Sequence, residues 1–115
     1  MHFKLLVAFV DTEKTHTVID VARGAGATGA TVIGQARGEG IEKAKSFFGM
    51  VVDSHRDLIL FLVEEHLSRD ILEAISKIAH FEESGGGMAI QIDVEDAVGI
   101  APQIRELTRV IEEEI

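Results

Sequence analysis

The sequence predicts an α+β fold, a ferredoxin-like βαββαβ sandwich that carries an extra C-terminal helix and assembles into an oligomer. Three observations support this prediction. Segments typical of strands and of helices follow in the order strand, helix, strand, strand, helix, strand and helix. Two of the strands are apolar on both faces. The 115 residues suit one domain, which we expect to span residues 1–115.

The first strand is predicted over residues 3–10, where apolar side chains alternate onto both faces. A helix over about residues 14–25 comes next, and Gly24 and Gly26 provide its C-terminal stop. Its buried face is marked by apolar residues at helical spacing: Val18, Val21, Ala22 and Ala25.

The second strand begins with the β-branched residues 31–33 and is expected to run to Arg37, before a glycine-rich turn. Residues 41–54 mix charged and aromatic side chains without a clear period. We therefore expect a loop there, with room for one helical turn.

The third strand is predicted over residues 56–64, a nearly continuous apolar run. A second helix is indicated by the spacing of Leu67, Ile71, Ala74, Ile75 and Ile78. Residues 88–94 alternate between apolar and more polar positions, which predicts the fourth strand. Pro102 suits the start of a last helix over about residues 102–115, with an apolar stripe formed by Ile104, Leu107, Ile111 and Ile115.

Both main helices should pack on the same face of the sheet, because crossover connections are right-handed. The strands at residues 3–10 and 56–64 are nevertheless apolar on both faces. The opposite face therefore needs a cover that the short terminal helix alone does not supply, and we expect further copies of the chain to provide it.

The net charge of −9 disfavours nucleic acids and anionic membranes as partners, since both are bound through basic patches. The longest apolar run, residues 58–63, is too short for membrane insertion. The absence of cysteine fits a reducing compartment, and we expect a cytoplasmic protein.

Glycine-rich segments are the candidate ligand-binding elements, because glycine lets backbone N–H groups approach a ligand closely. Residues 24–29 are interpreted mainly as a helix stop and tight turn. Gly38 and Gly40 flank an open loop beside Arg37, which gives them a stronger functional claim.

The run Gly85-Gly86-Gly87 directly precedes a strand and exceeds what a plain turn needs, so we expect it to contact a ligand. Arg37 and Arg56 are the basic residues best suited to join it there.

Catalytic and metal sites receive little support. The histidines lack metal-binding spacing, and no nucleophile has an identifiable base beside it. The pairs Glu64/Glu65 and Glu82/Glu83 are interpreted as solvated ends of elements. We therefore expect a protein that is not an enzyme.

A known family shares the most distinctive of these segments. The stretch Gly26-Ala27-Thr28-Gly29-Ala30-Thr31-Val32, the turn Arg37-Gly38-Glu39-Gly40 and the later glycine run resemble the PII nitrogen-regulator family, and the order of elements agrees over residues 3 to about 100. By this resemblance, residues 38–54 would be the T-loop, 82–87 the B-loop and 96–101 the C-loop.

The resemblance implies a homotrimer that binds adenine nucleotides between subunits and contacts a partner protein through its T-loop. The positions that match the nucleotide site are Thr31, Gly38, Gly40, Gly85 and Gly87, while Arg56 stands where the family has a lysine.

Several charged positions of the family are replaced. Met88 stands at the place of the B-loop lysine, and Gly99 and Ala101 at those of the two C-loop arginines. Glu42 replaces the T-loop glutamine that supports binding of magnesium and 2-oxoglutarate, and the chain has no tyrosine to be modified. We therefore expect a divergent PII-like sensor with weaker affinity for triphosphates.

The predicted function is regulation of a partner protein by a small effector, with an adenine nucleotide as one candidate and nitrogen or related metabolism as the setting. The alternative is a CutA-like trimer that binds metals or acts in stress responses. It would need histidines and carboxylates gathered in space, with Asp53 and His55 as the residues to test.

Overall fold

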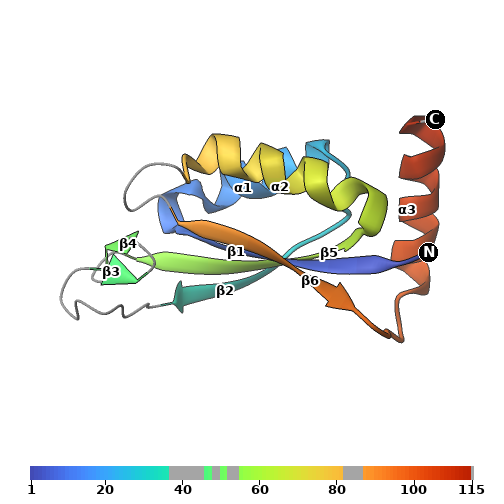
Figure 1. Ribbon diagram of the computed structural model, residues 1–115, viewed down its shortest axis with the longest axis horizontal. Helices are drawn as coiled ribbons and strands as arrows, with labels where there is room; N and C mark the ends of the chain where they lie inside the picture. The colour runs from blue at the N-terminus through green and yellow to red at the C-terminus, as the bar shows by residue number, and fades with distance from the viewer. Residues whose placement is uncertain (37–45, 48–49, 52–54, 82–86, 115) are drawn as a thin grey trace.

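The computed structural model describes residues 1–36, 46–47, 50–51, 55–81 and 87–114. A four-stranded antiparallel sheet has the order β2-β5-β1-β6, and helices α1 and α2 cover one of its faces (Figure 1). The elements are β1 (Phe3–Asp11), a 3₁₀ turn (Thr12–Lys14), α1 (Thr15–Gly24), β2 (Thr31–Ala36), β3 (Ser46–Phe47), β4 (Met50–Val51), β5 (Arg56–Glu64), α2 (Glu65–Ala79), β6 (Met88–Val94) and α3 (Ala101–Glu114).

The predicted fold class is confirmed, and the bounds of β5 and β6 coincide with the expected ones. The prediction for residues 41–54 needs correction, because β3 and β4 pair with each other as a short antiparallel ladder where we expected an irregular loop. Alternating charges had hidden the strand period there. Within the described ranges, no helix combines the length and apolar content needed to cross a membrane.

The pairing of β1 with β5 sets which residues share a face. The ladder runs without a shift from Phe3 opposite Glu64 to Asp11 opposite Arg56. Side chains directly opposite each other project from the same face of a sheet, and successive side chains alternate. The face that meets the helices therefore receives Leu6, Ala8 and Val10 from β1 and Ile59, Phe61 and Val63 from β5.

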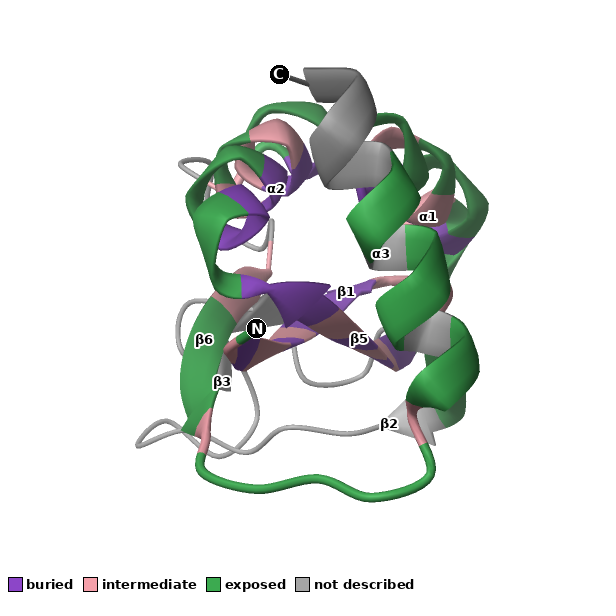
Figure 2. Cartoon of the chain, turned by 90° about the vertical axis from the view of Figure 1, so that its right-hand side faces the viewer, coloured by how far each residue is buried: buried purple, intermediate pink, exposed green. Residues whose placement is uncertain are grey.

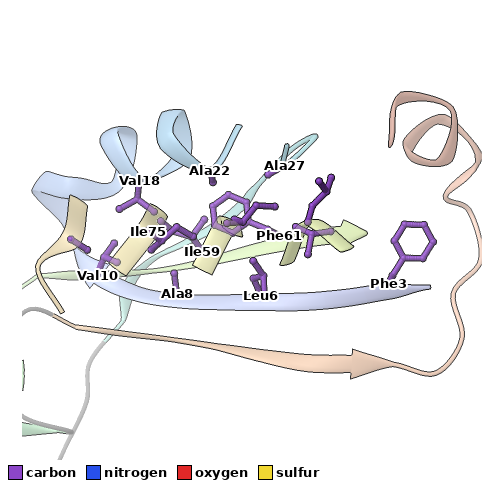
Figure 3. Close-up of a cluster of buried hydrophobic side chains, with 14 residues drawn as sticks. Phe3, Leu6, Ala8, Val10, Val18, Ala22, Ala27, Ile59, Phe61 and Ile75 are labelled. Atoms are coloured by element: carbon purple, nitrogen blue, oxygen red, sulfur yellow. The ribbon is translucent and has the colours of Figure 1, made fainter. Parts of the chain in front are cut away.

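The hydrophobic core lies between this face and the two helices (Figure 3). Leu6, Ile59 and Phe61 are fully buried against helical residues that include Val18 and Ile75. Complete burial of such a side chain contributes about 1.5 to 3 kcal/mol to folding. The core therefore fixes the position of the helices on the sheet.

The opposite face, which we call the open face, is apolar but carries no helix (Figure 2). Leu58, Leu60 and Leu62 of β5 lie along its centre and are partly exposed. Towards the edges, exposure rises to 48% at Ile33, 42% at Ile90 and 47% at Ile92. A continuous apolar surface of this kind marks an interaction site.

Helix α3 stands beyond the end of the sheet at which β1 begins and β6 ends (Figure 1). Residues 95–100 carry the chain there from the β6 edge towards the side where β2 lies (Figure 2). Among the described residues, α3 lacks the extensive packing that joins α1 to α2 and both to the core.

A buried carboxylate joins the start of β5 to the start of α1. Asp57 is 7% exposed, and its oxygens accept hydrogen bonds from Thr15 Oγ1 at 2.6 Å and Thr12 Oγ1 at 3.2 Å. The backbone N–H of Thr12 also donates to His55 O at 3.2 Å. These bonds tie the entry of β5 to the 3₁₀ turn and to α1.

Replacing Thr15 with valine keeps the shape of the side chain but removes one of the two hydroxyl donors to Asp57. The buried carboxylate oxygen would lose its partner, which should lower the free energy of unfolding by about 1 to 3 kcal/mol. Urea titrations at fixed protein concentration measure the change. The control is Thr17→Val on the exposed side of α1, which should stay within about 0.5 kcal/mol of the wild type; equal losses in both variants would contradict the role given to Asp57.

Candidate functional site

A hollow of about 280 Å³ opens beside the start of β2. Leu60 and Leu62 of the open face supply its apolar part, and Thr31 is the register partner of Leu60. Its volume lies near the lower end of the range for small-molecule sites. The lining residues are Thr28, Gly29, Ala30, Thr31, Leu60 and Leu62.

The turn after α1 positions the hydroxyl-bearing wall of the hollow. The N–H of Ala27 bonds to Ala22 O at 2.9 Å, which folds the chain back over the end of the helix. Gly26 has a φ of +120°, and a Cβ there would lie 2.9 Å from Leu67 Cδ1 of α2. Glycine at this position therefore permits the turn that leads residues 28–30 into β2.

The chemistry of the hollow suits an uncharged, flat group. Leu60 and Leu62 offer apolar surface, while Thr28 and Thr31 offer hydroxyls that can donate or accept hydrogen bonds. None of the described residues that line it carries a charge. An aromatic heterocycle with polar edges matches these features, whereas a highly charged group does not.

Arg56 lies on the same face of β5 as Leu60 and Leu62, but nearer to the start of the strand. Its side chain is 2% exposed, and Nε and Nη1 are buried without a hydrogen-bond partner. Leaving a buried donor unpaired costs about 1 to 3 kcal/mol, and more for a charged group. The guanidinium is thus an unsatisfied cationic donor.

Gly87 lies where the chain enters β6 and passes very close to β1. Its φ is +106°, and an added Cβ would lie only 2.2 Å from the backbone oxygen of Phe9 and 3.2 Å from Phe81 Cε1. Because the nearest atom belongs to the backbone, a side chain at residue 87 cannot be accommodated by a change of rotamer.

The eight site residues predicted from the sequence are only partly placed by the structure. Thr31 lines the hollow, Arg56 shares its face of the sheet, and Gly87 makes the close approach to β1. The others lie outside the described residues, as do most of the T-loop and B-loop: Arg37, Gly38, Gly40, Gly85 and Gly86.

Five lining residues were missed from the sequence. Residues 24–29 were interpreted mainly as a helix stop, which holds for Gly26 but not for Thr28 and Gly29, which line the hollow. A usable signal was the shared stretch from Gly26 to Val32, whose threonines frame the wall. Leu60 and Leu62 carried no such signal, because they look like any core leucine.

The prediction that Glu64 is a solvated residue was wrong. Its side chain is 3% exposed and caps α2, accepting hydrogen bonds from the backbone N–H of His66 at 2.8 Å and pairing with His66 Nδ1. The hydrogen bond to Glu64, followed by its charge, raises the pKa of His66. Glu65 completes a group of three potential metal ligands within 4.8 Å, but Glu64 already uses both oxygens on His66.

A second polar cluster joins β1 to β6 on the exposed surface. Asp93 accepts hydrogen bonds from His2 and from Lys4 Nζ at 2.9 Å. These bonds, led by the one from His2, lower the pKa of Asp93. The cluster joins neighbouring strands and lies outside the group that lines the hollow.

The fold and the hollow first define a class, that of ferredoxin-like α+β proteins with a small recess on the open face of the sheet. The sequence then assigns the family, because residues 3–103 match the family described as nitrogen regulatory protein P-II. The chain belongs to this family of signalling proteins.

Solved structures with the same fold include CPII from Thiomonas intermedia K12 bound to ADP, AMP and acetate, with a TM-score of 0.68, 23% identity and coverage of 86% of this chain and 92% of that chain. For CPII bound to ADP and bicarbonate the values are 0.63, 23%, 82% and 87%. A putative PII-like signalling protein from Thermus thermophilus gives 0.61, 20%, 82% and 87%. No curated protein sequence matches the chain.

Gly87→Ala should lower the free energy of unfolding by about 2 to 4 kcal/mol, because it combines a positive φ with a clash against the Phe9 backbone. Gly99→Ala is the matched control, since Gly99 has a φ of +81° but no neighbour within 4 Å of an added Cβ. It should cost about 1 kcal/mol. Chemical unfolding compares the two, and a Gly99→Ala loss as large as that of Gly87→Ala would show that the contact with β1 is unimportant.

Proposed function

We propose that this chain is a PII-like regulatory protein that binds a small effector between subunits and acts on a partner protein without catalysing a reaction. The hollow beside β2 is the observation that carries the proposal. It combines an apolar floor with two threonine hydroxyls in a chain of the P-II family.

An adenine nucleotide is the effector that the hollow favours. The adenine base is flat, can stack on Leu60 and Leu62, and has polar edges that threonine hydroxyls can recognise. CPII, which shares the fold, has been solved with ADP and AMP. Thr31, Arg56 and Gly87 are the described residues that we assign to the ligand site, together with Arg37, Gly38, Gly40, Gly85 and Gly86.

Triphosphates should bind more weakly than in other family members. Met88, Gly99 and Ala101 occupy the positions at which the resemblance expects a lysine and two arginines, and none of them can neutralise a phosphate. Each missing charge-assisted hydrogen bond removes about 1.5 to 3 kcal/mol of interaction. The base should therefore contribute a larger share of the affinity than the phosphates do.

A homotrimer would complete the site and cover the open face. Ile33, Ile90 and Ile92 leave an apolar surface that a second copy can bury. The hollow is walled by residues 28–31 and floored by β5, so it leaves space for a neighbouring subunit to close it. Residues 38–54 would then contact the regulated protein, and ligand-dependent ordering of a loop is an established way to switch such contacts.

The metal-binding alternative has less support. The acid and histidine group at the start of α2 already serves as a helix cap, and the residues selected for that alternative do not form a described cluster, since Asp53 lies outside the described residues.

Isothermal calorimetry with adenosine, AMP, ADP and ATP tests the effector. Thr31→Val keeps the shape of the wall but removes a hydroxyl, and should weaken adenine nucleotides about three- to tenfold. Thr17→Val, on the exposed side of α1, should bind as the wild type does. The proposal fails if the wild-type protein binds none of the four ligands, and Thr31 has no role if both variants bind equally.

Light scattering tests the assembly and should give three times the mass of one chain. Ile92→Lys places a charge on the open face, where the native side chain is 47% exposed, and should shift the protein towards the monomer. Val98→Lys is the control, because Val98 is 93% exposed and lies outside the strands. A monomeric wild-type protein at micromolar concentration would contradict the trimer.

A further inference from the structure

Arg56 is the buried charged group whose hydrogen-bonding needs the chain leaves unmet. It is 2% exposed, and neither Nε nor Nη1 has a partner. A guanidinium cannot lose its proton in a protein, so burial cannot be relieved by neutralisation. An anion that reaches Nε or Nη1 would satisfy it.

The neighbouring carboxylates do not serve as this anion. Asp57 projects to the helix-covered face, where its oxygens accept hydrogen bonds from Thr12 and Thr15. Asp11 is the register partner of Arg56 in β1, yet the two form no ion pair. Within the described strands, the other acidic residue on the open face is Glu64, which lies at the far end of β5 and caps α2.

The location of Arg56 relates it to the hollow. Arg56, Leu58, Leu60 and Leu62 project from the same face of one strand, so Arg56 and the floor of the hollow share a continuous surface. Four residues of strand separate the Cα atoms of Arg56 and Leu60 by about 13 Å. An arginine side chain and a nucleoside monophosphate together can span that separation.

We propose that Arg56 holds the phosphate of a nucleotide whose base occupies the hollow. This inference rests on the proposed function and adds the group that recognises the oxyanion. The strand then presents both parts of the ligand site: leucines for the base, and a pre-positioned guanidinium for the phosphate. The chain would thus supply from β5 a charge that it lacks at residues 88, 99 and 101.

The experiment compares adenosine with AMP, which differ only in the phosphate. Calorimetry on the wild-type protein should show tighter binding of AMP. Arg56→Gln removes the charge and should abolish this preference, lowering AMP affinity about tenfold or more while adenosine binds as before. Arg69→Gln on the exposed surface of α2 is the control and should keep the preference.

Arg56→Lys provides a second variant, since it keeps the charge but loses the planar fork. It should retain an AMP preference smaller than that of the wild type, and it tests the same point if Arg56→Gln fails to fold. Circular dichroism and light scattering establish folding and assembly for each variant. Equal weakening of adenosine and AMP would assign Arg56 to the fold and overturn the inference.

Two further outcomes identify the source of the oxyanion and the level at which an idea fails. Bicarbonate or acetate that binds through Arg56 alongside AMP, without competing with it, would assign the guanidinium to a free anion and overturn the phosphate assignment. Wild-type binding of adenosine without an AMP preference would overturn this inference alone. No binding of either ligand would overturn the proposed function and this inference together.

Discussion

The unshifted ladder between β1 and β5 is the constraint on which the rest of the structure depends. It aligns two strands that are apolar on both faces, and a slip by one residue would exchange the residues on the two faces. Hydrophobicity alone does not specify this register, because both faces are apolar. The helices specify it through the shapes of Leu6, Ile59 and Phe61, which fill the space beneath them.

Once the register is set, the two faces take different roles. The helix-covered face carries the stability of the single chain, while the open face carries the leucines of the hollow and, further along β5, Arg56. Ligand chemistry is therefore concentrated on the face that contributes least to the core. A side chain there can change its chemical character without disturbing the packing between sheet and helices.

The fold could be predicted from the sequence because its strands and helices have clear periods and glycine boundaries. β5 and β6 were located to the residue for this reason. The site was less accessible, since nothing local distinguishes Leu60 beside a hollow from Ile59 in the core. Glu64 was misjudged for a related reason: an acidic residue after a strand looks solvated until the helix that it caps is in place.

The cross-strand pairing of Ala36 with Arg56 has a consequence for how the family can diversify. The segment between β2 and β5 leaves and re-enters the sheet at neighbouring positions, so the sheet itself closes that loop. The entropy of closing a loop grows only with the logarithm of its length, by about 0.6 kcal/mol for each doubling. Insertions and deletions between these two residues are therefore tolerated at little thermodynamic expense, and the scaffold can acquire new recognition segments while its register stays the same.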